Sequence, residues 1–326
     1  MKLDELPRYP LGFFPTPIEP LPNLSARLGG PQLWVKRDDQ TGLATGGNKT
    51  RKLEYLLAEA LRQGCDTLLT IGAPQSNHAR QTAAAAAKAG LKRALVLRGR
   101  APDERTGNIL IDDLIGAEVF WAGARPDGDA LAEVADELRA RGQKPYVIPL
   151  GGSNPIGAAG YVTAMLEFVQ QSRSIDMTFE AIVFATSSGG TQSGLVVGAR
   201  LAGYTGRIVG ISVDHTADQL IPALADLAQA TADHIDLPLA FDRTDFEVND
   251  HYLGGGYAVM GEPEREAIAL CAQTEGLLVD PVYTGRALAG LIDLVRRGEF
   301  KRDQKVLFWH TGGLPALFAY ARQLTA

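Results

Sequence analysis

Short apolar runs alternate with longer stretches of helical periodicity along most of the chain. The short runs are rich in β-branched and aliphatic residues and end at glycine, proline or charged residues, which predicts strands. They are Leu33–Arg37, Thr67–Ile71, Ala94–Leu97, Glu118–Trp121, Tyr146–Pro149, Ala181–Thr186, Ile208–Val213 and Val306–Trp309. The helical stretches are Asn48–Gln63, Gln75–Ala89, Arg105–Leu114, Gly128–Arg141, Asn154–Gln171, Thr191–Ala202, Pro263–Gly276, Thr284–Arg297 and Leu314–Gln323. This alternation is typical of parallel sheets with helices on both faces.

One break in this pattern predicts a domain junction. The segment Gly151–Pro155 closes a first series of strand–helix units, and a second series begins after it. The early strand at Leu33–Arg37 either stays with the first series or pairs with the second. In the second case, the first domain is an insertion in the larger one.

Composition and charge narrow the class of protein. Of the 326 residues, 45% are hydrophobic and 21% charged, as in an ordinary globular chain with a sizeable core. Lysine and arginine total 32 against 38 acidic residues, which gives a net charge of −6. Because the chain has no basic stripe, we expect neither a nucleic acid nor a membrane as a partner.

Cysteine usage and the N-terminal sequence indicate a cytoplasmic protein. The 2 cysteines, Cys65 and Cys271, lie far apart and in neither CxxC nor zinc-type spacing. We therefore expect no disulfide framework and no metal site. The segment Met1–Pro7 lacks the basic and apolar regions of a signal peptide, and no apolar run approaches the roughly 18 residues of a membrane span.

The densest polar motif is the stretch Thr45–Glu54, in which a glycine pair leads into a predicted helix. Lys49 falls in the first turn, where the helix dipole and the neighbouring Arg51 and Lys52 disfavour a further positive charge. A lysine in such a place tends toward a lowered pKa, which a Schiff-base nucleophile needs. The alternative is a surface helix start with solvated cations. A phosphate-binding P-loop is disfavoured, because Asn48 stands where its lysine belongs.

A second motif, Gly72–Gln81, follows an apolar strand and opens a helix. In open α/β sheets, ligands bind outside the carboxyl ends of the strands, and a helix N-terminus there offers free N–H groups to an anion. Ser76 and Asn77 are candidates for this site, or they are plain N-caps. His78 alone is weak evidence, since a histidine at a helix start is more often a hydrogen-bonded spectator.

A third motif, Thr186–Leu195, also follows a strand and opens a helix. Its glycines and hydroxyl residues can form a nest of N–H donors around a phosphate monoester. GxGxxG is not present, because Ser188 occupies the first glycine position, and GxSxG is not present either. A dinucleotide fold and a serine hydrolase are therefore disfavoured. The alternative is a tight turn without a ligand.

Two C-terminal motifs, Asp280–Arg286 and His310–Pro315, follow apolar strands and are expected at the same rim. Tyr257 follows a glycine run that can bring its phenol close to a ligand. An activated lysine, a phosphate cup, an anion-binding helix start and tyrosine hydroxyls are together what pyridoxal phosphate requires.

Taken together, these motifs resemble those of a known enzyme family. The chain resembles the D-cysteine desulfhydrase and 1-aminocyclopropane-1-carboxylate deaminase family, within the tryptophan synthase β-subunit-like (fold type II) pyridoxal phosphate enzymes. The similarity runs through FPTP, KRDD, GGNKTRKLE, QSNHARQTAA, SSGGTQSG, DPVYTG and HTGGLPALFAY, in order and over nearly the whole chain. It implies an α/β fold of two open, twisted, mostly parallel sheets flanked by helices. The smaller domain (49–154) would be inserted in the larger one (1–48 and 155–326).

The resemblance also implies roles for individual residues. Lys49 would be the Schiff-base lysine, Asn77 would hydrogen-bond the phenolic oxygen of the cofactor, and Ser76 would bind the substrate carboxylate or relay a proton. Tyr257 and Tyr283 would line the substrate side. The remaining cofactor-binding positions implied are the phosphate cup Ser188, Gly189, Gly190 and Thr191, then Lys52 beside it, Thr311 at the pyridine nitrogen, and Thr284.

For activity, the resemblance implies β-elimination from D-cysteine to pyruvate, ammonia and hydrogen sulfide. L-Cysteate sulfo-lyase, which releases sulfite, is the first alternative. The deaminases place Glu after the DPVY tyrosine and Leu after the final His, where this chain has Thr284 and Thr311. A non-catalytic pyridoxal phosphate-binding protein is disfavoured by Lys49, since binding alone does not require this lysine. A small amino acid is the expected partner molecule, and a homodimer the expected assembly.

Overall fold

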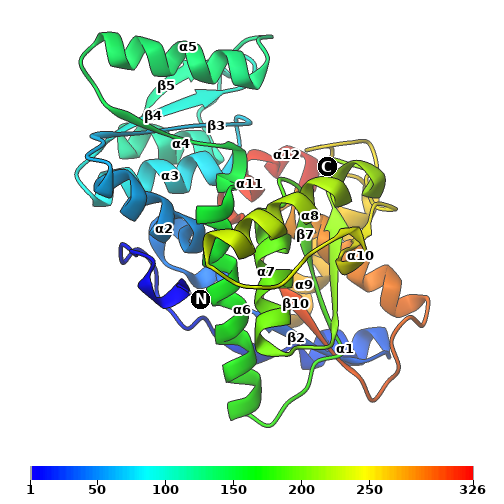
Figure 1. Ribbon diagram of the computed structural model, residues 1–326. Helices are drawn as coiled ribbons and strands as arrows, with labels where there is room; N and C mark the ends of the chain where they lie inside the picture. Colours follow the sequence, from blue (N-terminus) through cyan, green and yellow to red (C-terminus); the bar gives the residue numbers. More distant parts are fainter. Residues whose placement is uncertain (1, 326) are drawn as a thin grey trace.

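The strands form two separate sheets in the computed structural model, which describes residues 2–325 (Figure 1). The larger sheet has the order β1 (Ile18–Pro20), β2 (Gln32–Lys36), β10 (Lys305–Trp309), β7 (Ala181–Thr186), β8 (Arg207–Ser212) and β9 (Glu247–Asn249). The smaller sheet has the order β5 (Glu118–Trp121), β4 (Lys92–Leu97), β3 (Thr67–Gly72) and β6 (Pro145–Ile148). All pairs are parallel except β1 with β2, so the expected mostly parallel α/β fold is confirmed.

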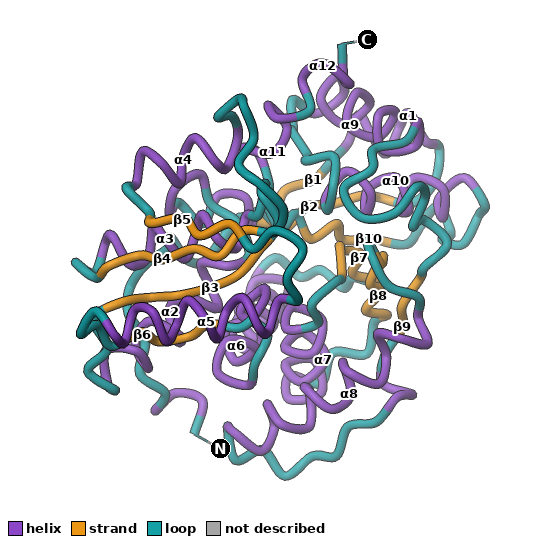
Figure 2. The backbone as a smooth tube through the Cα atoms, turned by 90° about the horizontal axis from the view of Figure 1, so that it is seen from above, coloured by secondary structure: helices purple, strands orange, loops and turns teal. Residues whose placement is uncertain are grey.

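The smaller sheet is an insertion in the larger one. Its strands follow one another along the chain between β2 and β7, whereas β2 pairs with β10 near the other end of the sequence. Of the two placements open for the strand at Leu33–Arg37, pairing with the second series is the one observed. Figure 2 shows the two sheets in separate parts of the molecule. The boundaries at 48/49 and 154/155 stay a prediction.

Helices cover both faces of each sheet. On the larger sheet, one face packs against α1 (Pro22–Leu28), α9 (Glu262–Glu275) and α10 (Thr284–Arg296). The other face packs against α6 (Pro155–Ser174) and α7 (Gly190–Ala202), with α8 (Ala217–His234) against these helices. On the smaller sheet, α2 (Lys49–Arg62), α3 (Asn77–Lys88) and α4 (Gly107–Ile115) lie opposite α5 (Asp127–Ala140). The chain ends with α11 (Leu314–Ala319) and α12 (Ala321–Leu324).

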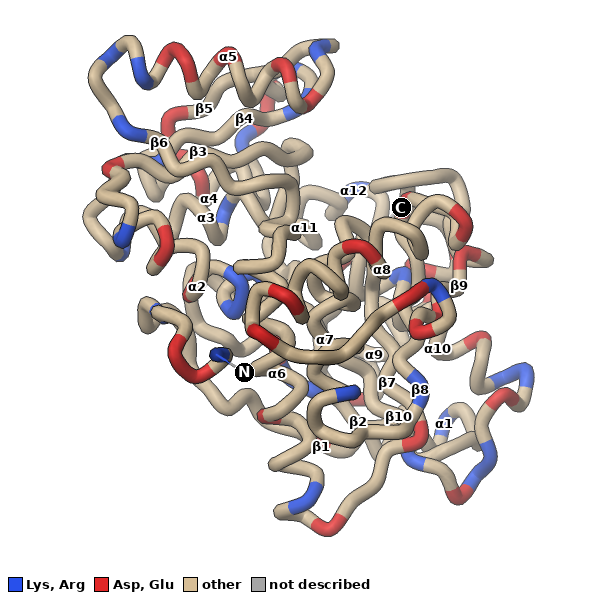
Figure 3. Tube along the Cα trace, viewed as in Figure 1, with Lys and Arg blue, Asp and Glu red and all other residues tan. Residues whose placement is uncertain are grey.

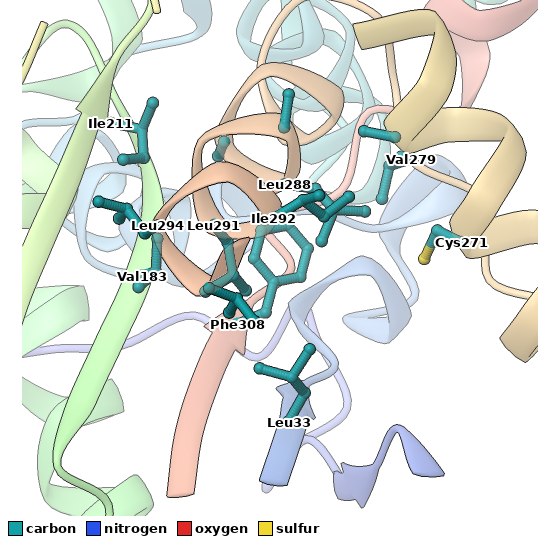
Figure 4. Close-up of a cluster of buried hydrophobic side chains, with 14 of the residues drawn as sticks. Leu33, Val183, Ile211, Cys271, Val279, Leu288, Leu291, Ile292, Leu294 and Phe308 are labelled. Atoms are coloured by element: carbon teal, nitrogen blue, oxygen red, sulfur yellow. The ribbon is translucent and has the colours of Figure 1, made fainter. Parts of the chain in front are cut away.

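Alternating side chains of the central strands fill two cores. Val183 and Phe308 point to one face, where they meet α10 (Figure 4). The next residues along the strands, Phe184 and Trp309, point to the opposite face, against α6 and α7. This period of two, with apolar residues at both phases, is why these strands read as continuous apolar runs.

Every strand and helix predicted from the sequence is present, with ends shifted by a few residues. The predicted helix Leu314–Gln323 is divided at Tyr320 into α11 and α12. Four elements were not predicted: the strands β1 and β9 and the helices α1 and α8. Short 3₁₀ turns lie at Leu3–Glu5, Asp38–Gln40, Leu43–Thr45, Leu150–Gly152 and Arg243–Asp245.

A buried ionic cluster fixes the start of α2. The Asp38 carboxylate accepts hydrogen bonds from Arg51 Nε and Nη2 at 2.9 and 2.8 Å, and Arg51 also pairs with Glu167 at 2.9 Å. Lys36 Nζ donates to Glu167 at 2.6 Å. Burial alone would raise the pKa of Asp38, but Arg51 and Lys36 outweigh it and lower that pKa to about 2.

Charged residues of both signs are otherwise interspersed over the surface elements, as α5 illustrates in Figure 3. Both cysteines are buried and free. Across residues 2–325, no helix combines the length and the apolar character needed to cross a membrane.

Candidate active site

A cavity of about 370 Å³ lies where the carboxyl ends of both sheets converge. Its walls come from the loops that follow β3, β4, β6, β7, β8 and β10, the first turn of α2, the loop between β9 and α9 with Tyr257, and the segment between α9 and α10 with Tyr283. The expectation that Asp280–Arg286 follows a strand is wrong, because residues 276–283 after α9 form no strand. Parallel strands bring all their carboxyl ends to one edge, so segments far apart in the sequence meet here. Among the residues predicted for the site, the cavity is lined by Lys49, Ser76, Asn77, Ser188, Gly189, Thr191, Tyr257, Tyr283 and Thr311.

Three predicted residues do not line the cavity. They are Lys52 in α2, Gly190 in α7 and Thr284 in α10, three helices that start at the cavity wall. None of the three residues is part of the cavity lining. Lys52 and Thr284 are completely or almost completely buried. Each of the three contacts a residue that does line the cavity or the turn beneath it, as described below.

Lys49 is the first residue of α2 and lines the cavity. Burial lowers the pKa of its amine from 10.5 to about 8. The sequence prediction of a lowered pKa agrees in direction, but it named the helix dipole, Arg51 and Lys52 as the causes. Asp38 and Glu167 compensate the charge of Arg51. The pKa of Lys49 is therefore lowered by desolvation and not by that neighbour.

The lowered pKa predicts how the cofactor-free protein reacts. Only the neutral amine attacks an aldehyde, so the rate at which Lys49 is modified should rise with pH and level off above about 8. An ordinary lysine reaches that plateau only above about 10.4. The measurement is the rate of reductive methylation of Lys49 by peptide mass spectrometry across pH. A midpoint near that of an ordinary lysine would contradict the assigned desolvation.

The start of α7 forms a cup at one end of the cavity. Gly189, its N-cap, has φ 91°, a left-handed conformation that glycine adopts without strain. Ser188 Oγ lies 2.9 Å from Ser153 Oγ, and the same Ser153 oxygen accepts the N–H of Gly190 at 3.1 Å. The Gly190 N–H is thus directed to Ser153, while Ser188, Gly189 and Thr191 face the cavity.

Lys52 lies directly beneath this cup. Its amine donates to Gly151 O at 3.0 Å and to Ser153 Oγ at 3.3 Å. A Cβ on Gly190 would come within 2.8 Å of the Lys52 amine, so glycine is needed for the close approach. Burial, and then Lys49, lower the pKa of Lys52 well below its ordinary value. A phosphate held in the cup would favour the charged amine and offset that shift.

Ser76 and Asn77 stand at the start of α3. Ser76 is the N-cap and accepts the N–H of Ala79 at 3.1 Å. This contact uses an acceptor lone pair and leaves the Ser76 O–H free as a donor. The capping interpretation is therefore correct, and it does not compete with a role in the site. His78 is buried with Nε2 2.8 Å from Thr70 Oγ1, as expected for a hydrogen-bonded histidine.

Tyr257 and Tyr283 form a pair that lines the cavity. Their hydroxyl oxygens are 2.7 Å apart, and their rings meet edge to face with centroids 6.0 Å apart. Burial raises the pKa of both phenols, so both are protonated near neutral pH. One hydroxyl donates to the other, which leaves one O–H donor for a ligand in the cavity.

The two threonines have different positions. Thr311 lines the cavity, as expected. Thr284 was expected at the same rim, but it is fully buried: Thr284 Oγ1 donates to Asp280 Oδ1 at 2.7 Å and accepts the Asp280 N–H at 2.8 Å. It also lies 3.3 Å from the carbonyl oxygen of Gly312. Thr284 therefore does not line the cavity. Its hydroxyl contacts Asp280 and Gly312, and of these two residues Gly312 lines the cavity.

Several cavity residues were missed by the sequence analysis. Asn48 Nδ2 donates to Thr191 Oγ1 at 3.1 Å and so joins the start of α2 to the cup. Ser187 Oγ donates to Asp214 Oδ2 at 2.5 Å. Arg98 and His215 also face the cavity. Asp214, His215 and Arg98 come shortly after predicted strands, so the rule of the carboxyl ends was the signal that could have found them.

Comparison with known proteins places this geometry in a family. Residues 9–312 match the family model described as pyridoxal-phosphate dependent enzyme. This chain belongs to the pyridoxal-phosphate dependent enzymes. It is 44% identical over 329 residues to a D-cysteine desulfhydrase of Klebsiella pneumoniae (strain 342), covering 98% of this chain and 99% of that protein.

Other relatives lie equally close within the pyridoxal-phosphate dependent enzymes. A 1-aminocyclopropane-1-carboxylate deaminase of Ralstonia pickettii (strain 12J) is 44% identical over 335 residues, covering 98% of each chain. The crystal structure of an ACC deaminase homologue superposes with a TM-score of 0.91 at 41% identity, covering 99% of this chain and 97% of the other. These likenesses confirm both the fold class and the expected cofactor.

The residues present fit pyridoxal phosphate. A half-buried lysine with a lowered pKa stands at position 49, and a glycine-based helix start at Ser188–Thr191 offers N–H groups to a phosphate. Thr186 Oγ1, next to this cup, is buried without a hydrogen-bond partner among the described residues. Asn77 and Thr311 also line the cavity and would be available to hold the cofactor.

Proposed function

We propose that this enzyme is a lyase that eliminates sulfide from D-cysteine, with L-cysteate as the first alternative substrate. The reaction takes D-cysteine and water to pyruvate, ammonia and hydrogen sulfide. With L-cysteate, sulfite leaves in place of sulfide. The 44% identity to a D-cysteine desulfhydrase over 98% of the chain supports this class of reaction. An equal identity to a 1-aminocyclopropane-1-carboxylate deaminase makes the choice of substrate depend on the cavity.

The two threonines at positions 284 and 311 carry the choice, because neither supplies the carboxylate that the deaminases have at position 284. The deaminases of this family carry leucine in place of Thr311, and glutamate in place of Thr284, by the resemblance noted above. Thr311 lines the cavity with a neutral hydroxyl, while Thr284 is sealed against Asp280. A neutral partner leaves a pyridine nitrogen less protonated than a carboxylate would. That environment suits a reaction in which the leaving group itself accepts electrons, as sulfide and sulfite do, better than ring opening.

Four residues of the cavity have tasks in this reaction. When bound, the cofactor supplies an electron sink for the negative charge that develops at the substrate Cα. The Lys49 amine, with a pKa of about 8, can take up the Cα proton at neutral pH. The Ser76 O–H can donate to the substrate carboxylate. The free donor of the Tyr257–Tyr283 pair can hydrogen-bond the departing sulfur.

The proposal is tested by a panel of substrates on the purified holoenzyme. D-Cysteine, L-cysteate, D-serine and 1-aminocyclopropane-1-carboxylate are compared by the release of 2-oxo acid, with sulfide and sulfite measured separately. We expect the highest kcat/KM for D-cysteine with stoichiometric sulfide. A higher kcat/KM for L-cysteate would favour the alternative, and a preference for the cyclopropane substrate would overturn the proposal.

Replacing Ser76 by alanine is expected to preserve the cofactor and reduce turnover. Loss of a hydrogen bond to a charged carboxylate costs about 1.5–3 kcal/mol, so kcat/KM should fall by at least about tenfold. The variant also loses an N-cap, which costs about 1 kcal/mol of stability. Ser76→Thr, which keeps cap and hydroxyl, is the matched control. Parent-like turnover in Ser76→Ala would remove Ser76 from substrate binding.

The homodimer and the cytoplasmic location stay predictions. Light scattering on the holoenzyme after size-exclusion chromatography would test the assembly. A mass equal to one 34.8 kDa chain would contradict the dimer.

A further inference from the structure

The amide of Asn77 is held from behind by two donors. Its Oδ1 accepts a hydrogen bond from Arg80 Nη1 at 3.1 Å and another from Asn108 Nδ2 at 3.0 Å. Within residues 2–325, no protein group accepts a hydrogen bond from Asn77 Nδ2, and Asn77 lines the cavity. The NH₂ group is thus the part of this amide left for a ligand.

The orientation follows from the chemistry of Arg80. A guanidinium has donors and no acceptor, so the atom it meets on each amide must be oxygen. Arg80 Nη1 contacts Asn108 Oδ1 at 2.8 Å as well as Asn77 Oδ1. Asn108 must then present its NH₂ to Asn77 Oδ1 and to Gln75 O, which lies 2.9 Å away. One donor-only side chain therefore sets the direction of both amides.

The same guanidinium reaches the loop before Lys49. Arg80 Nη2 donates to Gly46 O at 2.7 Å, three residues before the lysine. Arg80 and Asn108 are both fully buried, and neither lines the cavity. Burial lowers the pKa of Arg80 to about 10, so the group is charged near neutral pH, and Asp112 and Asp280 oppose that shift.

We propose that Arg80 and Asn108 are positioning residues that hold the Asn77 amide with its NH₂ toward the phenolic oxygen of the cofactor. Arg80 also ties this amide to the loop that carries Lys49. The Asn77 amide and the loop before Lys49 are then fixed relative to each other by one buried side chain. This inference concerns the cofactor and does not depend on which amino acid is the substrate.

The test uses the visible absorption of the bound cofactor, measured across pH without substrate. A donor at the phenolic oxygen stabilises its deprotonated form, so losing that donor moves the absorption change to higher pH. Asn77→Ala is the reference for complete loss. We expect Asn77→Ala to move the midpoint upward by about one pH unit, which corresponds to ~1.4 kcal/mol.

Asn108→Asp is the decisive variant. Its carboxylate can still accept from Arg80 but cannot donate to Asn77 Oδ1, and it favours an amide turned with NH₂ away from the cavity. Because Arg80 still donates to Asn77 Oδ1, the two neighbours then favour opposite directions of the amide, and we expect an upward shift that is smaller than in Asn77→Ala but clearly above the parent midpoint. Asn108→Ser, which loses the reach to Asn77 without adding charge, should shift in the same direction and serves if Asn108→Asp does not fold.

Two further variants separate positioning from stability. In Arg80→Lys the side chain still has only donors, so the midpoint of the absorption change should stay close to that of the parent. In Arg80→Met, which has no donor, the midpoint should move upward. Tyr204→Phe, which loses a buried hydrogen bond to Phe179 O outside the site, should lower the melting temperature and leave the midpoint unchanged. Parent-like midpoints in Asn108→Asp and Asn108→Ser would overturn the proposal, and so would a parent-like midpoint in Asn77→Ala.

Discussion

Lys49→Ala is expected to lower kcat/KM for 2-oxo acid formation by at least about a thousandfold, the largest effect of any substitution in the cavity. The variant loses the amine that attaches the cofactor and the base that takes the Cα proton. A positioned acid or base alone contributes about 10²–10⁴ in rate, and the loss of covalent attachment adds to it. The fold should persist, because Lys49 makes no ion pair among the described residues.

The measurement pairs kinetics with chemical mapping. Borohydride reduction of the yellow parent enzyme followed by peptide mass spectrometry should find the pyridoxyl group on Lys49. The variant should carry no stable label. Lys301→Ala, an exposed lysine in a turn far along the chain, is the control and should match the parent. A label on any other lysine of the parent would remove Lys49 from the mechanism.

Asp38→Ala is expected to destabilise the protein by about 3–5 kcal/mol, the cost of breaking a buried ion pair from one side. Besides Arg51, the carboxylate accepts hydrogen bonds from Tyr161 at 2.6 Å, Trp309 at 2.8 Å and Thr16 at 2.9 Å. All these buried donors would lose their partner together. Urea unfolding of the cofactor-free protein measures the loss without a contribution from ligand binding.

The same carboxylate gives a pH signature. A carboxyl whose pKa is lowered on folding contributes stability above its ordinary value of 3.8, and that contribution is lost as pH falls toward about 2. The difference in unfolding free energy between parent and Asp38→Ala should shrink across that interval. Asp136→Ala, which removes an exposed i,i+3 pair with Arg139, should change stability by less than about 0.5 kcal/mol. Equal losses in the two variants would contradict the role of the buried cluster.

The sequence predicted the elements with strong periodicity and missed those whose signal is short or contradictory. The strands β1 and β9 have three residues each, too few to show alternation. α1 has only seven residues. α8 is longer, but Pro222 lies within it, and an interior proline normally marks a helix end. Tertiary packing against α7 through Leu220 and Leu224 holds this helix together across the proline.

Most of the site residues that belong to motifs line the cavity, as predicted from the sequence. The errors are residues such as Thr284 and Lys52, which lie buried behind the cavity wall. Thr284 sits in the turn where it was expected, but its hydroxyl faces Asp280, a direction that sequence spacing cannot show. Lys52 lies one helical turn after Lys49, and its amine points behind the cup to Gly151 and Ser153, a direction that sequence spacing cannot show either. Asp214 and Arg98 belong to no motif, so only the strand ends before them indicated a place at the cavity.

The order of strands has a consequence for synthesis on the ribosome. β10 lies between β2 and β7 in the larger sheet, yet it begins at Lys305, near the end of the chain. At about 5–20 residues per second, β2 waits roughly 15 to 50 seconds for its partner. The smaller sheet, contiguous from Thr67 to Ile148, can assemble during that wait.

Thr311 emerges only after β10, so the cavity is completed late, with only α11 and α12 still to follow. A nascent chain therefore carries a finished small sheet long before it carries a place for the aldehyde cofactor. Translation that stops before Lys305 yields a product without β10, the strand between β2 and β7, and without Thr311. Such a truncated product has an incomplete cavity, so cofactor binding distinguishes it from chains that extend past Thr311.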